Sequence, residues 1–390
     1  MRKMGKLFLV LLLAGTLGAC QSKEKDTGKK DPTPKTEEKK PDKDVSVSFL
    51  AVGDNLIHNS LYLDPTYKTE NGWDFTAMYE NTNPYTQNVD IANINQETIL
   101  GGPELELSNY PMFNGPHEIA DAVAAAGFDW VVHASNHSMD RGEAGIVSDR
   151  NYWDKFQDIK VTGINRSQQE ADTAVILKRK GIKFGLLNYT YGTNGIELPE
   201  GKEYLVNLID KEKMKKDIQK LKKQSDVIVV SMHWGEEYSF IPNEEQEELA
   251  QFLADQGVQV IIGSHPHVIQ PMEFIEGKNG NKTLVIYSLG NFISAQIEDY
   301  QMLGGMARWN IVKQAKTGKY EVTDAEFWPT VTFYRHDGSG NMVGFKTYAL
   351  KDYTDDIAAQ HGLAPAVSRQ YFIDKSNEVL GTMDHIKIVY

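Results

Sequence analysis

The feature that most constrains the fold is a recurring pattern in which a short apolar stretch runs directly into a polar residue. Six such stretches occur, at residues 45–52, 89–94, 128–133, 226–232, 258–262 and 283–287. Continuous apolar runs of this length are typical of strands that are buried on both faces, as in α/β folds. The polar residues that follow them are Asp54, Glu97, Asn136, His233, His265 and Asn291.

Helical spacing in the intervening segments supports an α/β fold. Residues 116–126 are predicted to form a helix that ends at Gly127. Met214, Ile218 and Leu221 lie one helical turn apart, and a further helix is expected around Leu249. In α/β folds the ligands bind beyond the carboxyl ends of the strands. The six polar residues are therefore predicted to converge on one site.

The residue types at these strand ends indicate a metal centre. Five of the ten histidines lie there, at positions 58, 137, 233, 265 and 267. Carboxylate, amide and imidazole ligands without thiolates suit Mn, Fe or Zn ions. The number of candidates exceeds what one zinc ion needs, so two divalent transition-metal ions are expected. The predicted metal ligands are Asp54, His58, Glu97, Asn136, His233, His265 and His267.

The polar residues belong to an ordered set of motifs: GDNLIH at 53–58, NQE at 95–97, NHSMDRG at 136–142, HWGEEY at 233–238, GSHPHVIQ at 263–270 and YSLGNF at 287–292. This set resembles the CapA family of poly-γ-glutamate capsule biosynthesis, within the calcineurin-like metallophosphoesterase superfamily. The resemblance covers roughly residues 45–329. The resemblance implies a four-layer α/β/β/α sandwich and a phosphoesterase-type active site.

The resemblance also implies roles for the ligands. Asp54 and His267 correspond to ligands of the first metal, and Glu97 to the bridging carboxylate, which is Asp in most of the superfamily. Asn136, His233 and His265 correspond to ligands of the second metal.

Two further residues resemble the catalytic pair of the family. His137 corresponds to the histidine that faces the substrate phosphate, and Asp140 would orient it. One position departs from the superfamily pattern, since Leu56 stands where a histidine is usual. Either His58 fills that place, or the first metal site is weakened.

Each candidate also has a structural interpretation. Asp54 is a possible turn residue after Gly53, and Asn136 could cap a helix. His233 could be a packed core histidine, and His265 and His267 could be exposed on a turn around Pro266. Asn291 could be either a turn former or a site residue.

The first 44 residues are predicted to target and tether the protein. Residues 7–17 form an apolar stretch with the length of a signal-peptide core. The small residues before Cys20, the chain's one cysteine, resemble a bacterial lipobox. A signal peptide at 1–19, membrane attachment through lipidated Cys20 and a disordered tether at 20–44 are expected; a simple secretory signal is the alternative. The predicted metallophosphoesterase-like domain spans 45–335, followed by an extension at 336–390.

Composition restricts the partners. The net charge of −13 repels polyanions, and we find no basic patch with interleaved aromatic residues. Nucleic acid is therefore not expected as a partner, whereas capsule or envelope polymer synthesis machinery is. The expected function is that of a membrane-anchored metallophosphatase-like protein of capsule biosynthesis. A cell-envelope phosphoesterase unrelated to capsule and a non-catalytic scaffold for a polymer synthase stay open as alternatives.

Overall fold

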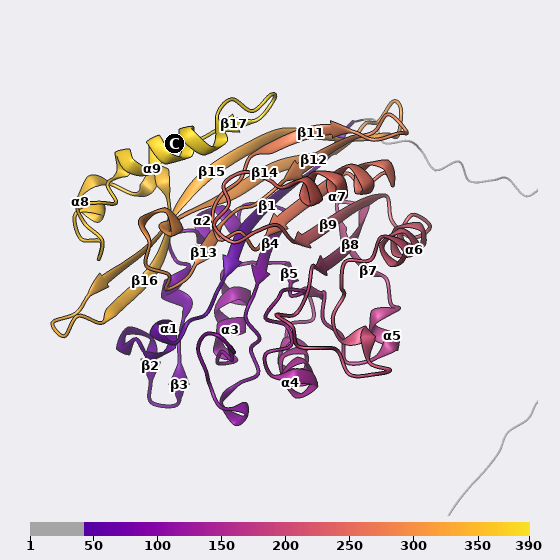
Figure 1. The fold of residues 1–390 in the computed structure, drawn as a ribbon. Helices are drawn as coiled ribbons and strands as arrows, with labels where there is room; N and C mark the ends of the chain where they lie inside the picture. The colour runs from indigo at the N-terminus through magenta and orange to yellow at the C-terminus, as the bar shows by residue number, and fades with distance from the viewer. Residues whose placement is uncertain (1–42) are drawn as a thin grey trace, which may run out of the picture. The chain divides into compact units, whose positions relative to one another are not determined.

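Strand β1 (Val45–Asn55) lies at the centre of the larger of two main sheets, which has nine strands (Figure 1). The computed structural model describes residues 43–390. On one side β1 pairs in parallel with β4, and on the other it pairs antiparallel with β14 and, at its end, in parallel with β13. The sheet order is β16-β15-β14-β1-β4-β5-β6, with β13 beside β1 and β17 beside β15. The other strands are β4 (Ile91–Gln96), β5 (Trp130–Val132), β6 (Lys160–Thr162), β13 (Asn291–Ile293), β14 (Leu303–Lys313), β15 (Tyr320–His336), β16 (Met342–Ala349) and β17 (Lys387–Ile388).

The second sheet has six strands in the order β11-β12-β10-β9-β8-β7. Its four inner strands are parallel, and the edge strands β7 and β11 run antiparallel to their neighbours. The strands are β7 (Val175–Arg179), β8 (Ile182–Thr190), β9 (Val227–His233), β10 (Val260–Ser264), β11 (Met272–Glu276) and β12 (Lys282–Ile286). A small hairpin of β2 (Lys68–Thr69) and β3 (Gly72–Trp73) stands apart from both sheets.

The two main sheets pack face to face with helices on their outer faces, which confirms the predicted α/β sandwich. Phe49 of β1 packs edge-on against Phe184 of β8, with ring centroids 5.0 Å apart. On the outer face of the second sheet, α6 buries Met214 and Ile218 and α7 buries Leu249 in one apolar cluster with β9 and β10. The helices are α1 (Asn59–Leu63), α2 (Asn83–Thr86), α3 (Glu118–Ala125), α4 (Gly142–Trp153), α5 (Gln168–Ala171), α6 (Lys211–Leu221), α7 (Glu244–Asp255), α8 (Asp355–Ala358) and α9 (Arg369–Leu380).

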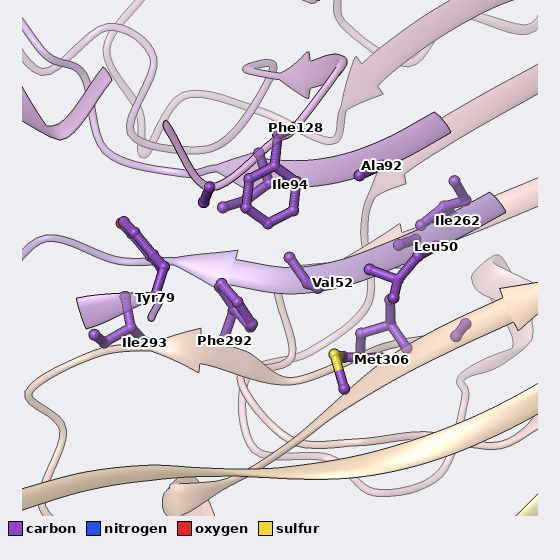
Figure 2. Close-up of a cluster of buried hydrophobic side chains, with 14 of the residues drawn as sticks. Leu50, Val52, Tyr79, Ala92, Ile94, Phe128, Ile262, Phe292, Ile293 and Met306 are labelled. Carbon is purple, nitrogen blue, oxygen red and sulfur yellow. The ribbon is translucent and has the colours of Figure 1, made fainter. Parts of the chain in front are cut away.

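The core around β1 is built mainly from aromatic and β-branched residues (Figure 2). Phe292 of β13 stacks on Tyr79, with ring centroids 5.8 Å apart, and meets Phe128 edge-on at 6.0 Å. Val52 and Ile94 are buried in the same cluster. The ends of β1, β4 and β13 are therefore anchored in a rigid core, which fixes the positions of the side chains that follow them.

The C-terminal segment completes the larger sheet. The predicted boundary at residues 335 and 336 falls inside β15, and residues 337–390 supply β16, β17 and α9. Phe372 and Leu380 of α9 are buried in the main core. The described residues, 43–390, lie in one compact unit.

The predictions for the N-terminal region concern residues outside the described part of the chain. These are the signal peptide, the lipidated Cys20 and nearly all of the tether. Within residues 43–390, no helix combines the length and the apolar character needed to cross a membrane.

Candidate metal centre

The predicted ligands meet where strands from both sheets end. Asp54 lies near the end of β1, Glu97 follows β4 and His233 is the last residue of β9. His265 and His267 form the turn after β10, where both adopt left-handed backbone conformations, with φ of 100° and 59°. Asn136 and His137 lie in the loop after β5. All seven of these residues are buried.

A close backbone approach holds Asp54 in place. The backbone N–H of Asp54 donates to the carbonyl of Gly290 at 2.8 Å. A Cβ atom at the preceding residue, Gly53, would lie 1.9 Å from that same carbonyl oxygen. Only glycine fits at position 53, so the glycine in the motif is required by packing.

The first set of potential ligand atoms comes from Asp54, Glu97 and His267, which lie within 4.8 Å of one another. His267 Nδ1 is 3.0 Å from Asp54 Oδ2 and 3.1 Å from Asn291 Oδ1. Because both neighbours are acceptors, Nδ1 carries the proton. Nε2, 3.5 Å from Glu97 Oε1, is then the atom that can bind a cation.

The second set comes from Glu97, His233 and His265. His233 Nε2 lies 2.9 Å from Asn136 Oδ1, and its Nδ1 lies 3.0 Å from Ser264 Oγ. Within the described part of the chain, His265 Nδ1 is buried without a hydrogen-bond partner. Asn136 adds an amide oxygen beside this set.

Burial keeps the two imidazoles of the second set uncharged, which is the form that binds a cation. Burial, with His267 and His137 nearby, lowers the pKa of His265 to about 3. Burial likewise holds the pKa of His233 well below its usual range. Both imidazoles are therefore neutral near pH 7, and each keeps a lone pair that can bind a metal ion.

The carboxylate of Glu97 belongs to both sets and is the strongest sign that a cation fits here. Both of its oxygens are buried, and neither has a hydrogen-bond partner among residues 43–390. Burial raises the pKa of Glu97 well above its usual range. Burial would lower the pKa of His267, but the carboxylates of Glu97 and Asp54 outweigh that effect and raise it to about 9. These carboxylates thus hold a proton on His267, and a divalent cation would displace that proton from Nε2 and supply the charge that balances both carboxylates.

His137 and Asp140 form a pair beside the two ligand sets. His137 Nδ1 lies 2.7 Å from Asp140 Oδ2, which also accepts from the backbone N–H of Phe113 at 2.6 Å. The Phe113 ring meets the imidazole edge-on at 4.7 Å. Asp140 therefore fixes the proton on Nδ1 and leaves Nε2 free to act on a ligand.

His58 is not brought into either ligand set of the described residues. It directly precedes α1 without a side-chain capping hydrogen bond, and its ring packs edge-on against Phe113, with ring centroids 5.2 Å apart. Its Nδ1 accepts from the backbone N–H of Ala295 at 3.2 Å. Burial lowers the pKa of His58 to about 4, so it is a neutral neighbour of the centre.

Three asparagine side chains contact the candidate ligands although none of them was among the predicted metal ligands. Asn95 Nδ2 donates to Asp54 Oδ1 at 2.9 Å. Asn136 Nδ2 donates to Asn194 Oδ1 at 3.2 Å. Asn291, for which a turn role was equally open, contacts His267. Asn95 and Asn291 lie within the motifs of the sequence analysis, whereas Asn194 lies in a loop outside every motif.

Together, the mixed α/β sandwich and the shared buried carboxylate define a metallophosphoesterase-type protein. The family model of the bacterial capsule synthesis protein PGA_cap matches residues 48–296. The chain belongs to this bacterial capsule synthesis family, which confirms the resemblance to CapA proteins.

Individual relatives agree with this family. The PGA biosynthesis protein CapA of Bacillus subtilis is 30% identical over 201 residues, which is 49% of this chain and 48% of the relative. The capsule biosynthesis protein CapA of Bacillus anthracis is 30% identical over 236 residues, 56% of this chain and 54% of the relative. The match thus spans about half the length of these curated relatives.

Among solved structures, the chain is similar to the calcineurin-like phosphoesterase YfkN of Bacillus subtilis. The TM-score is 0.44 at 15% identity, over 86% of this chain and 99% of that one. That likeness is too distant to say anything about chemistry.

Proposed function

We propose that this protein is a membrane-anchored, metal-dependent phosphoester hydrolase that serves poly-γ-glutamate or related capsule biosynthesis. The main support for the proposal is that both sets of ligand atoms share the carboxylate of Glu97. This carboxylate is buried and has no hydrogen-bond partner among the described residues. A shared carboxylate of this kind suits a pair of divalent cations. The ligand types favour Mn, Fe or Zn.

Each ligand set would bind one of the two ions. Asp54, Glu97 and His267 would hold one ion, and Glu97, His233 and His265 the other, with the amide oxygen of Asn136 beside it. When bound, such ions polarise a phosphoryl oxygen and lower the pKa of a water molecule. The burial of these ligands excludes bulk water and keeps their geometry fixed.

His137 has a separate task in this proposal. Because Asp140 holds the Nδ1 proton, Nε2 of His137 can face the phosphoester. There it would stabilise developing charge or protonate the leaving oxygen, as a positioned general acid does. Asp140 sets the tautomer and the orientation of the ring, and so acts through His137.

The cellular setting is proposed from the sequence and the relatives. A lipidated Cys20 would attach the protein to the outer face of the cell membrane, and residues 21–44 would let the folded unit reach its partners. The names of the Bacillus relatives refer to PGA and capsule biosynthesis. The proposed partners are accordingly the machinery of capsule or envelope polymer synthesis.

The test compares three variants with the wild type for metal content and for phosphoesterase rate. We expect His137→Ala to keep its metal and lose about 10²–10⁴-fold in rate, the usual contribution of a positioned acid or base. His265→Ala should lose metal as well as rate, because a missing ligand empties a site. Asp140→Asn should keep metal and lose less rate than His137→Ala.

A control and two outcomes make the test decisive. His336→Ala removes an exposed histidine on β15 and should match the wild type in both measurements. Equal metal loss in the His137, Asp140 and His265 variants would contradict the separate role of His137. Intact metal without any phosphoester turnover in the wild type would reject the hydrolase and favour the scaffold hypothesis.

A further inference from the structure

We propose that Tyr110, Tyr191 and Tyr238 form an aromatic rim around the metal centre that binds the alcohol part of the substrate. The inferred substrate is a phosphoester that carries a neutral ring, either a sugar or a nucleoside. This inference rests on the proposed hydrolase function and names its substrate class.

Exposed apolar side chains lie on the loops around the candidate centre. Of the seven large hydrophobic residues that are exposed in the described region, six lie on loops that carry or contact site residues. These six are Tyr110, Met112, Tyr191, Tyr238, Ile241 and Ile297, and the seventh is Leu63. Exposed apolar side chains clustered around one site mark a binding surface.

Each tyrosine of the rim is linked to a different histidine of the site. The Tyr191 ring lies 4.7 Å from the His265 ring, and the Tyr238 ring lies 6.1 Å from the His267 ring. Tyr110 lies 6.2 Å from Phe113, whose ring contacts His137. A group attached to a phosphate at the centre would therefore lie among rings that come from three separate loops.

The three tyrosine rings are only partly covered by the other described residues, so part of each ring surface is open to a ligand. Tyr110 is 72% exposed, Tyr191 45% and Tyr238 39%. Tyrosine offers a flat apolar face for stacking and a hydroxyl for hydrogen bonding. Such a surface suits a ring that bears hydroxyl groups, and it gives a simple alkyl phosphate little to contact.

Charge at the rim favours a neutral group. Glu236 and Glu237 are exposed on the same loop as Tyr238. Their carboxylates would repel an anionic chain such as polyglutamate beside Tyr238. Gln296 Nε2 donates to Tyr238 Oη at 3.2 Å, so amide and phenol groups stand together where ring hydroxyls would bind.

The test uses the full-length protein with Mn²⁺ and three probes: glucose 1-phosphate, adenosine 5′-monophosphate and glycerol 3-phosphate. The variant is Tyr110→Ala, because this ring reaches the centre only through Phe113 and is largely exposed. Loss of one stacking partner should lower kcat/KM for the preferred ring compound by about threefold to tenfold relative to glycerol 3-phosphate. Tyr110→Phe should retain the preference, and Leu63→Ala should match the wild type. Glucose 1-phosphate and adenosine 5′-monophosphate are compared for their loss of kcat/KM in Tyr110→Ala. A larger loss for the first identifies the ring as a sugar, and a larger loss for the second identifies it as a nucleoside.

A second measurement separates this inference from the proposed hydrolysis. Saturation-transfer NMR should detect magnetisation passing from the protein to the ring protons of the preferred compound, and Tyr110→Ala should reduce it. Ring contact without any hydrolysis would uphold the rim and reject the hydrolase. Equal losses of kcat/KM for all three probes, or no transfer to either ring compound, would overturn the rim.

Discussion

Replacing Glu97 by glutamine tests the shared carboxylate directly. Glutamine has nearly the same shape, so the packing around position 97 should survive. The substitution removes the one carboxylate that both ligand sets use. Glu97→Gln should therefore empty both sites, whereas Asp54→Asn, which touches only the first set, should empty one.

The expected change in melting temperature follows from mass action. An ion at 100 times its Kd stabilises the folded state by about 2.7 kcal/mol, if it does not bind the unfolded chain. A folded unit of about 350 residues has an unfolding entropy of about 0.7 kcal/mol/K, from about 2.1 cal/mol/K per residue. Two ions should thus raise the wild-type Tm by about 7 °C and a single ion in Asp54→Asn by about 4 °C, with almost no rise in Glu97→Gln.

The assay is differential scanning calorimetry with and without Mn²⁺, together with elemental analysis of bound metal. The metal-free forms supply the control. Since burial raises the pKa of Glu97, its ionised form is unfavourable in the folded state, and metal-free Glu97→Gln should melt no lower than metal-free wild type at pH 8. A Glu97→Gln protein that still binds one ion with full affinity would refute the bridging role.

Two further predictions concern the anchor and the support of the second set. Cys20→Ala should move the protein from the membrane fraction to the soluble fraction after cell breakage, because the lipid is the proposed attachment; a variant that stays membrane-bound would exclude it. Asn194→Ala should weaken metal binding at the second set by about tenfold, because the Asn136 amide is then free to rotate. A metal titration in which the affinities of both ligand sets are unchanged would exclude this role.

The positions of Asp54, Glu97 and His233 in the fold could be predicted from sequence because each follows or ends a strongly apolar strand. The periodicity of residues 45–52 places Asp54 at a strand end, and the same reasoning applies to Glu97 and His233. Parallel strands bring such ends to one edge, so local pattern was enough to predict convergence. The observed strand ends β1, β4 and β9 agree with that expectation.

The remaining features depend on tertiary packing that no local pattern encodes. Asn194 reaches Asn136 only because the loop after β8 folds over the second set. His58 shares a motif with Asp54, yet the turn into α1 directs its Nδ1 to the backbone of Ala295. The strands after residue 336 went unpredicted because their apolar residues pack on β15, which lies at a fixed register only in the folded sheet.

The central place of β1 in its sheet sets the order in which the centre can assemble. One edge of β1 pairs with β14, whose last residue is Lys313, more than 250 positions later in the chain. While the chain is being synthesised, that edge is an unpaired apolar strand, open to pairing with other chains. Asp54 reaches its final position only after β14 docks and Gly290, the residue before β13, accepts the backbone hydrogen bond of Asp54. Any metal would then be bound only after most of the chain has folded, and a product truncated before β14 would be prone to aggregate.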